Sequence, residues 1–208
     1  GRYSEAIADY SKAIELDPDY SSAFYNRGKA QSKLKNYELA ISDLQRTMEL
    51  EPDRTDAIME LGVVHDAKGE YEKAIDCYNR VLAINPDVTD ARYNRGIANF
   101  SRWKYAEAIP DFKWVTENNP SDHEAFYNLG SSFFNLNNDD EALENYNKAI
   151  ALHKENGTYF IERGRTYNAL KQYTRAIIDF NEALRLNNQS SEAYLLKGSA
   201  KYNMNEPD

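Results

Sequence analysis

The residue types that most often perform catalysis are few and scattered in this chain. His65, His123 and His153 lie far apart and lack the short spacing of a metal site. The single cysteine, Cys77, has no evident base near it in the sequence, and one cysteine excludes an internal disulfide. A glycine-rich phosphate loop and a nucleophile elbow are both absent. We therefore expect a protein that is not an enzyme and that holds no cofactor and no metal.

Tyrosine and asparagine are the residue types that indicate binding. The chain has 16 tyrosines. A tyrosine supplies apolar area with a polar end, and an asparagine amide both donates and accepts hydrogen bonds, so it can hold a peptide backbone without reading its sequence. The pairs Tyr25-Asn26, Tyr93-Asn94 and Tyr127-Asn128 are separated by multiples of 34 residues. The elements that position them must therefore repeat.

A period of 34 residues runs through the whole chain without an insertion. One column of the repeat is always glycine, and a second column is always alanine. The two columns are Gly28, Gly62, Gly96, Gly130, Gly164, Gly198 and Ala6, Ala40, Ala74, Ala108, Ala142, Ala176. Agreement of two independent columns at one spacing predicts a repeat protein.

Each repeat has the pattern of two helices. Residues 55–68 and 71–85 carry apolar side chains at helical spacing, and the short break around Gly69 predicts antiparallel packing. A glycine inside a helix costs about 1 kcal/mol relative to alanine, so we expect the second helix to approach too closely there for a Cβ atom. Large second-helix residues are expected to fill the facing space, namely Tyr10, Leu44, Tyr78, Phe112, Tyr146 and Phe180.

This pattern resembles the tetratricopeptide repeat family. The resemblance is clearest in residues 24–28 (Phe-Tyr-Asn-Arg-Gly) with Ala40, Leu44 and Pro52, and it covers essentially all 208 residues. It implies an all-α fold, a right-handed α-solenoid or superhelix of about twelve helices. The first helices of such a superhelix line a concave groove that usually holds a peptide or protein segment. Family members usually act as scaffolds or adaptors.

The repeat boundaries follow from the two columns. We expect a single array, 1–208, which opens and closes on half repeats and has no polar cap at either end. It is therefore expected to be a fragment of a longer protein. The expected segments are 1–20 (second helix only), 21–54, 55–88, 89–122, 123–156, 157–190 and 191–208 (first helix only).

Arginine precedes the repeat glycine in alternate repeats, where the family normally has an apolar residue. Aspartate stands sixteen residues after each of these arginines, whereas Leu61 and Leu129 are followed at that spacing by Cys77 and Asn145. A partly buried arginine needs a carboxylate, because an unpaired buried charge is costly. We therefore expect ion pairs between the two helices of a repeat. One alternative is that the arginines bind a ligand, and a competing geometry pairs an arginine with the preceding repeat, for instance Arg27 with Asp9. The expected pairs are Arg27–Asp43, Arg95–Asp111 and Arg163–Asp179.

The repeats 89–122 and 123–156 are the best candidates for the binding groove, because only there do adjacent first helices both offer tyrosine, asparagine and phenylalanine. The alternative is that these side chains serve the packing of the repeat. Trp103 and Trp114 form a second candidate contact site on the outer surface, where Trp114 is expected to face solvent. The groove candidates are Tyr93, Asn94, Ile97, Phe100, Tyr127, Asn128, Ser131 and Phe134.

The resemblance also limits the expected partner. The family's chaperone-binding members use a carboxylate clamp of lysine, asparagine and arginine, but this chain lacks the flanking cations. We therefore do not expect it to bind acidic chaperone C-terminal tails. At the positions where a lysine would be needed, the chain has Ser22, Asp56, Asp90, Glu124, Thr158 and Glu192.

The formal net charge of −9 disfavours nucleic acid and anionic lipid as partners, and no apolar run is long enough for membrane insertion. An RNA reader of the pentatricopeptide type has a period of 35 and a basic surface, so it is a weak alternative. A second alternative is a substrate-recruiting arm of a larger enzyme, like the superhelix of the O-linked N-acetylglucosamine transferase, although Glu60 and Glu162 interrupt the asparagine column. The expected partner is a protein or peptide, and the expected location is cytoplasmic.

Overall fold

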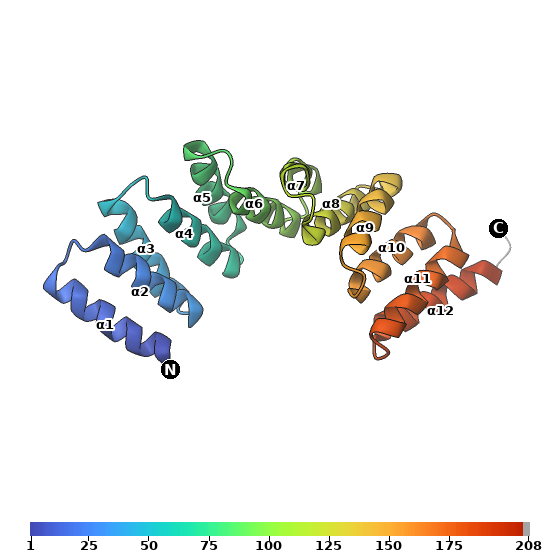
Figure 1. The fold of residues 1–208 in the computed structure, drawn as a ribbon, viewed down its shortest axis with the longest axis horizontal. Helices are drawn as coiled ribbons and strands as arrows, with labels where there is room; N and C mark the ends of the chain where they lie inside the picture. Colours follow the sequence, from blue (N-terminus) through green and yellow to red (C-terminus); the bar gives the residue numbers. More distant parts are fainter. Residues whose placement is uncertain (206–208) are drawn as a thin grey trace. The chain divides into compact units, whose positions relative to one another are not determined.

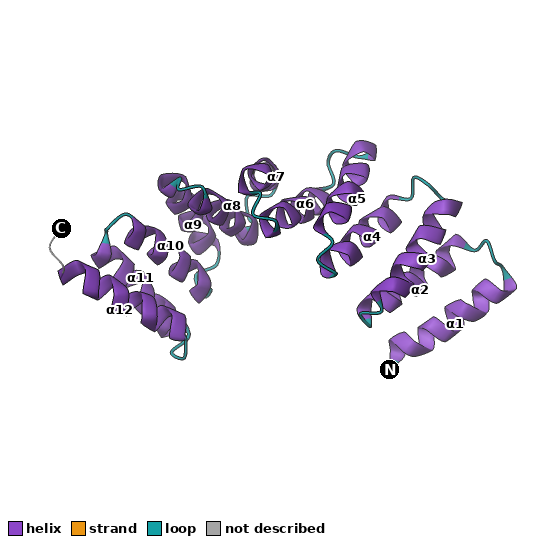
Figure 2. Ribbon diagram, turned by 180° about the vertical axis from the view of Figure 1, so that it is seen from behind, coloured by secondary structure: helices purple, strands orange, loops and turns teal. Residues whose placement is uncertain are grey.

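The computed structural model describes residues 1–205, and within that range every regular element is an α-helix (Figures 1 and 2). The all-α repeat fold predicted from the 34-residue period is confirmed. The twelve helices of the described range are α1 Arg2–Leu16, α2 Ser21–Lys33, α3 Tyr37–Leu50, α4 Thr55–Ala67, α5 Tyr71–Ile84, α6 Thr89–Ser101, α7 Tyr105–Asn118, α8 His123–Asn135, α9 Asp139–Leu152, α10 Gly157–Ala169, α11 Tyr173–Leu186 and α12 Ser191–Asn205.

The chain forms two compact units, residues 1–103 with α1 to α6 and residues 104–208 with α7 to α12. Within each unit every helix packs against the next one along the chain (Figure 1). The boundary falls between the two helices of the repeat 89–122, so this repeat contributes α6 to the first unit and α7 to the second.

The residue that follows the first helix by two positions has a positive φ in every full repeat. Glycine adopts this conformation without a steric cost, as at Gly69, and asparagine tolerates it at Asn137. At the two lysines and at Trp103 it costs roughly 1–2 kcal/mol. The same backbone conformation therefore forms this turn in every full repeat, although the residue types at the position do not predict it. The residues are Lys35, Gly69, Trp103, Asn137 and Lys171, with φ between 57° and 77°.

The glycine column marks the closest approach of the two helices of a repeat. A Cβ atom on Gly62 would lie 2.6 Å from Cε1 of Tyr78, and one on Gly164 would lie 2.7 Å from Cε1 of Phe180. The same holds at Gly130 against Tyr146 (2.9 Å) and at Gly28 against Leu44 (3.1 Å). The large residue sixteen positions after the glycine therefore occupies the space that a side chain would need, as predicted. Five members of the large-residue column are completely buried, namely Leu44, Tyr78, Phe112, Tyr146 and Phe180.

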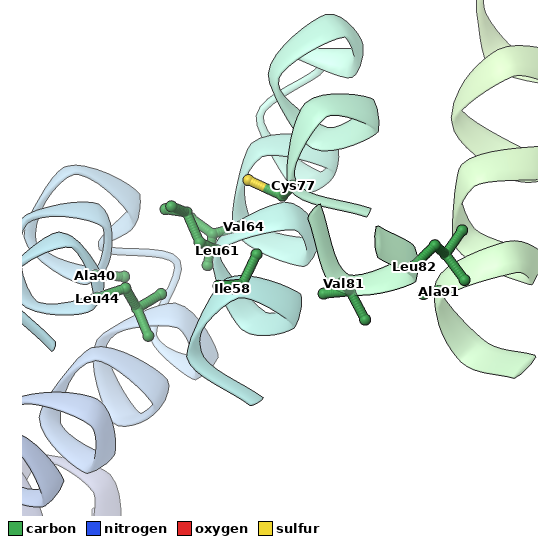
Figure 3. Close-up of a cluster of buried hydrophobic side chains, with 9 residues drawn as sticks. All are labelled: Ala40, Leu44, Ile58, Leu61, Val64, Cys77, Val81, Leu82 and Ala91. Carbon is green, nitrogen blue, oxygen red and sulfur yellow. The ribbon is translucent and has the colours of Figure 1, made fainter. Parts of the chain in front are cut away.

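The apolar core of the first unit runs from one repeat into the next. Figure 3 shows a buried cluster to which α3, α4, α5 and α6 all contribute. A repeat in such a core depends on its neighbours for most of its burial, because no single helix pair encloses the cluster. The cluster consists of Ala40, Leu44, Ile58, Leu61, Val64, Cys77, Val81, Leu82 and Ala91.

We predict opposite effects of the same substitution at two members of the glycine column. Gly62→Ala should lower the free energy of unfolding by about 1 kcal/mol, because an overpacking cost of about 1–3 kcal/mol exceeds the gain in helix propensity. A Cβ atom on Gly198 would meet nothing within 4 Å, so Gly198→Ala should raise stability by about 1 kcal/mol. Urea unfolding followed by circular dichroism checks both values. Equal effects at the two sites would contradict the close-approach explanation.

Candidate functional site

The residues with nucleophilic or basic potential in the first unit are used for packing. His65 is buried, and its Nδ1 lies 2.7 Å from Oε2 of Glu70. Burial raises the pKa of the Cys77 thiol to about 11, so the thiol is protonated and a poor nucleophile at neutral pH. Neither side chain has the accessibility that a catalytic group requires.

His123 and His153, which are 30 residues apart, lie together in the second unit. Their ring centroids are 4.6 Å apart in an edge-to-face arrangement, and Nδ1 of His123 lies 2.8 Å from the hydroxyl of Tyr159. Sequence spacing could not show this, because it depends on α8 and α10 packing beside the end of α9. No group of three histidine, cysteine or acidic residues in the described range is arranged to hold a metal ion.

Two of the expected arginine–aspartate pairs are present with bidentate geometry. Arg27 donates from Nε and Nη2 to the two carboxylate oxygens of Asp43 at 2.8 and 2.7 Å. Arg163 makes the same two bonds to Asp179, at 2.8 and 2.7 Å. The aspartate side chains are only 9% and 4% exposed, so each depends on its arginine. The third pair, Arg95–Asp111, joins residues of different units and stays a prediction.

Each of these arginines also contacts a polar residue of the repeat before it; for Arg27 that residue is Ser11, whereas the competing geometry named Asp9. Nη1 of Arg27 donates to Oγ of Ser11 at 3.1 Å, and Nη1 of Arg163 donates to Oδ1 of Asn147 at 2.6 Å. Arg95 makes the equivalent bond to Asn79 at 2.6 Å. The polar residue always lies sixteen positions earlier, but every residue of that column is polar, so the sequence alone does not single out these three contacts. The guanidinium groups are thus occupied by the fold, which argues against a role in ligand binding.

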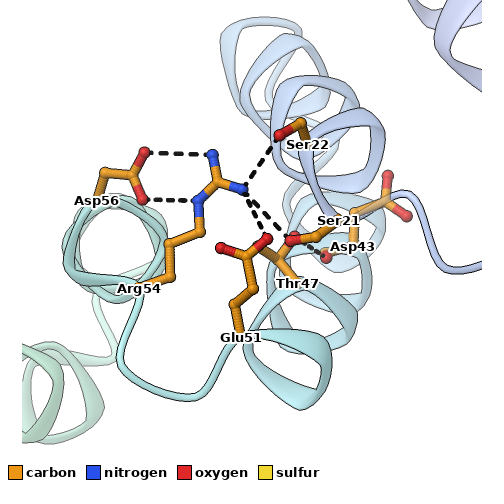
Figure 4. Close-up of polar contacts among 7 residues, drawn as sticks. All are labelled: Ser21, Ser22, Asp43, Thr47, Glu51, Arg54 and Asp56. Carbon is orange, nitrogen blue, oxygen red and sulfur yellow. Dashed lines mark hydrogen bonds and ion pairs between the residues drawn. The ribbon is translucent and has the colours of Figure 1, made fainter.

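The sequence analysis did not predict any role for Arg54. It precedes α4, and its guanidinium carbon lies 4.6 Å from the ring centroid of Tyr25 on α2. Figure 4 shows its polar contacts, a bidentate pair with Asp56 and hydrogen bonds toward Ser21 and Ser22. Tyr25 is therefore partly covered by the next repeat, so this member of the tyrosine column serves packing.

The first-helix surface of the first unit holds four of the groove candidates. Tyr93, Asn94, Ile97 and Phe100 all lie on α6 and are half-buried. On α4, Oδ1 of Asp66 is buried and accepts no hydrogen bond within the described structure. Burial raises the pKa of the Asp66 carboxyl above its ordinary value. This surface therefore contains an acidic group whose charge is incompletely compensated.

The other four candidates lie on α8 in the second unit. Tyr127, Asn128 and Phe134 are half-buried. Ser131 is buried and its hydroxyl accepts a hydrogen bond from the Tyr146 hydroxyl at 3.1 Å, so its side chain serves the core. The Tyr127 ring stacks on the Tyr159 ring with centroids 5.0 Å apart. Tyr127 therefore combines packing between repeats with a partly accessible edge.

A charged cluster on α10 and α12 adjoins these residues. Nη1 of Arg165 lies 3.2 Å from Oε1 of Glu162 and 4.0 Å from Oε1 of Glu192. The guanidinium also lies over the Phe134 ring, 5.7 Å from its centroid. Burial raises the pKa of the Glu162 carboxyl, and the neighbouring Arg165 acts in the opposite direction. Cation, carboxylate and aromatic ring thus meet on one surface.

The tryptophan candidates differ in exposure. Trp103 is 79% exposed at the end of the first unit. Trp114 is half-buried on α7 in the second unit, so it is less accessible than expected.

Family models match most of the chain. A model described as tetratricopeptide repeat matches residues 28–89 and 140–191, which is more than half of the 208 residues. Two further models with that description match residues 61–126 and 123–156, and a model described as TPR repeat matches residues 1–35. The chain therefore belongs to the tetratricopeptide repeat family.

The similarity to an individual curated protein covers much less of the chain than the family models do. A protein SGT1 homolog of Oryza sativa subsp. japonica is 47% identical over 38 residues, which is 18% of this chain and 10% of that protein. The chain thus matches about a tenth of this curated relative.

Among solved structures, YrrB, described as a TPR protein with an unusual peptide-binding site, superposes with a TM-score of 0.80 at 22% identity, over 91% of this chain and 97% of YrrB. MamA from Desulfovibrio magneticus RS-1 gives a TM-score of 0.79 at 20% identity, over 82% of this chain and 97% of that one. These identities establish the shared fold alone.

The helices of the described range are short and polar in comparison with a membrane span. None of them combines the length and the apolar character needed to cross a bilayer.

We predict that Arg163→Leu will cost about 3 kcal/mol in unfolding free energy, because Asp179 stays buried without its partner. A surface ion pair would cost only about 0–1 kcal/mol. The control is the double variant Arg163→Leu, Asp179→Asn, which copies the natural combination Leu129 and Asn145. The double variant should recover stability to within about 1 kcal/mol of wild type in urea unfolding. A double variant as unstable as the single one would disprove the pairing explanation.

We also predict a pH-dependent effect of Asp66→Asn. Because burial raises the folded-state pKa of Asp66 above that of the unfolded chain, the carboxylate destabilises the folded protein at neutral pH. The variant should therefore be more stable than wild type at pH 7. Its advantage should shrink as the pH falls through the folded-state pKa, and disappear below about 4, the ordinary pKa of aspartate. Thermal unfolding across pH measures this, and the exposed Asp76→Asn serves as the control; a gain that does not vary with pH refutes the explanation.

Proposed function

We propose that this chain is a non-catalytic protein-interaction scaffold that binds an extended peptide or protein segment along its first helices. The observation that carries the proposal is a set of half-exposed aromatic and amide side chains that the first helices keep at repeat spacing, beside the large residues that both kinds of helix bury in the core. Those side chains are Tyr93, Asn94 and Phe100 on α6 and Tyr127, Asn128 and Phe134 on α8.

The chemistry of these residues suits a peptide backbone. An asparagine amide can donate to a peptide carbonyl and accept from a peptide N–H at the same time. The adjacent tyrosine and phenylalanine rings offer apolar surface at low entropy cost. A column of such groups recognises an extended chain without demanding a particular side chain at each position.

The charges favour a segment that carries basic side chains. Asp66 lacks a hydrogen-bond partner for Oδ1 within the described structure, and the Glu162 carboxyl is largely buried beside a single arginine. A lysine or arginine of the ligand would supply the missing positive charge, and the net charge of −9 would attract it from a distance. We therefore expect binding that weakens as salt is added.

Family membership supports the same role. YrrB, which shares the fold, is described as having a peptide-binding site. The buried Cys77, with its raised pKa, and the paired His65 offer no accessible nucleophile or base.

The test is selection of binding peptides from a random display library against the purified chain, followed by affinity measurement. Asn94→Ala with Asn128→Ala should weaken the selected peptides by about 1–3 kcal/mol for each lost amide, since ligand backbone groups are left unsatisfied. Asn118→Ala, an exposed asparagine on α7, is the matched control and should bind like wild type.

The salt titration separates two forms of the proposal. Affinity that falls between low and physiological salt supports basic side chains in the ligand; constant affinity indicates that stacking and amide contacts dominate. Unchanged affinity in the double asparagine variant, with its helix content intact, contradicts the first-helix site and redirects attention to Trp103 and Trp114.

A further inference from the structure

Two buried side-chain oxygens that lack a hydrogen-bond partner among the described residues belong to the same repeat, 55–88. One is Oδ1 of Asp66 on the first helix α4, and the other is the hydroxyl oxygen of Tyr78 on the second helix α5. The Tyr78 side chain is completely buried, with its ring against Gly62, which lies one helical turn before Asp66. An unpaired buried polar group is costly, so two of them in one repeat need a physical explanation.

The repeat 123–156 shows how a tyrosine in the same column finds a partner. The Tyr146 ring lies against Gly130, and its hydroxyl donates to Oγ of Ser131 at 3.1 Å. Tyr78 occupies the same column, but the residue in the place of Ser131 is Val63, which has no polar side-chain atom. Val63 is 37% exposed. The equivalence of the two repeats therefore places the Tyr78 hydroxyl beside a surface valine instead of beside a serine that could bond to it.

The two oxygens lie in acidic surroundings. Burial raises the pKa of the Tyr78 hydroxyl, and the negative charges of Asp66 and Glu60 raise it further, so both carboxylates lie close enough to act on it. Lys68, the lysine nearest to Asp66 in the sequence, pairs instead with two glutamates, at 2.7 and 2.8 Å. A positively charged donor from outside the chain would therefore suit both oxygens.

A lysine ammonium group has the properties that these atoms require. It carries a positive charge and three N–H donors that point in different directions. Two of the donors can therefore bond to oxygens that come from different helices, Asp66 on α4 and Tyr78 on α5. An arginine guanidinium is planar, and its paired donors suit the two oxygens of a single carboxylate, as Arg27 shows with Asp43. The arrangement thus favours lysine over arginine.

We propose that the repeat 55–88 binds a lysine side chain of the partner segment, whose ammonium group donates to Oδ1 of Asp66 and to the hydroxyl oxygen of Tyr78. The methylene groups of the lysine would pack on the exposed side of Val63. Asp66 is half-buried, so its carboxylate and the valine need only turn at the surface to admit the ammonium group. This inference rests on the proposed peptide-binding function and adds to it the residue type that is recognised and the place where it binds.

The first experiment compares two defined peptides, acetyl-Ala-Ala-Lys-Ala-Ala-amide and its counterpart with norleucine in place of lysine. Each is titrated into the isotope-labelled chain up to millimolar concentration, and the backbone amide signals of α4 are followed by NMR. Because norleucine keeps the methylene groups and lacks the ammonium group, its peptide should bind about tenfold more weakly. The arginine counterpart should also bind more weakly than the lysine peptide.

The variant Tyr78→Phe separates binding from folding. Phe112 and Phe180 occupy the same column, so the variant should fold, and removal of an unpaired hydroxyl should leave the unfolding midpoint unchanged or higher. Its preference for the lysine peptide over the norleucine peptide should nevertheless fall severalfold. The matched control is Tyr146→Phe, which removes a hydroxyl that is bonded to Ser131. That control should lower the unfolding midpoint and keep the lysine preference.

A second pair of variants tests the carboxylate. Asp66→Asn should abolish the preference for the lysine peptide, because the amide carries no charge to pair with the ammonium group. Asp76→Asn removes an exposed charge from the same repeat, so it changes the net charge equally and should keep the preference.

The outcomes separate the lysine site from the proposed function. A lysine preference that depends on both Asp66 and Tyr78 supports the site. Equal binding or no binding of the lysine and norleucine peptides overturns it, and so does a preference that is unchanged in Asp66→Asn or in Tyr78→Phe. If peptides selected from the display library then still depend on Asn94 and Asn128, the first-helix binding function stands and only the lysine site is rejected. If the library also yields no binder, both proposals fail.

Discussion

The close contact between a glycine of the first helix and a large residue sixteen positions later is the constraint on which this structure depends. Without a Cβ atom at Gly62 or Gly164, the facing aromatic ring can lie directly on the helix backbone. This contact fixes the distance and the register of the two helices together, because any slip would bring a side chain against the ring. Once the register is fixed, every other column of the repeat has a set place. Both kinds of helix contribute to the core, and the first helices also keep a half-exposed surface for other uses.

The arginine bridges form between helices whose register the glycine contact has already fixed. Each guanidinium reaches a buried aspartate in its own repeat and a polar oxygen of the preceding repeat, as Arg163 does with Asp179 and Asn147. Such buried pairs add little net stability over a well-packed apolar alternative, which the chain itself uses at Leu61 and Cys77. The bridges instead favour one helix arrangement, because an arginine can bond to its aspartate and to the polar residue of the preceding repeat only when the three helices have one relative position.

Each unit has an electrostatically unfavourable carboxyl group on its first helices, Asp66 in one and Glu162 in the other. Asp66 has a carboxylate oxygen without a partner in the described structure, and the carboxyl groups of Asp66 and Glu162 both have pKa values raised by burial. These features cost stability in the unbound protein, as is common where a protein binds a ligand. A basic segment that pairs with them would recover the cost on binding.

The 34-residue period was enough to predict the helical repeat, the role of the glycine column and the spacing of the arginine–aspartate pairs. These features depend on positions within one repeat, and a period of 34 shows each of them several times. Three features could be seen only in the folded structure, namely the position of Arg54 over Tyr25, the contact of His123 with His153, and the burial of Ser131. Each of these depends on distances between residues of neighbouring helices, at positions where the repeats differ in residue type. A periodic sequence pattern predicts what the repeats share, whereas the contacts that distinguish one repeat from another follow only from how the side chains pack.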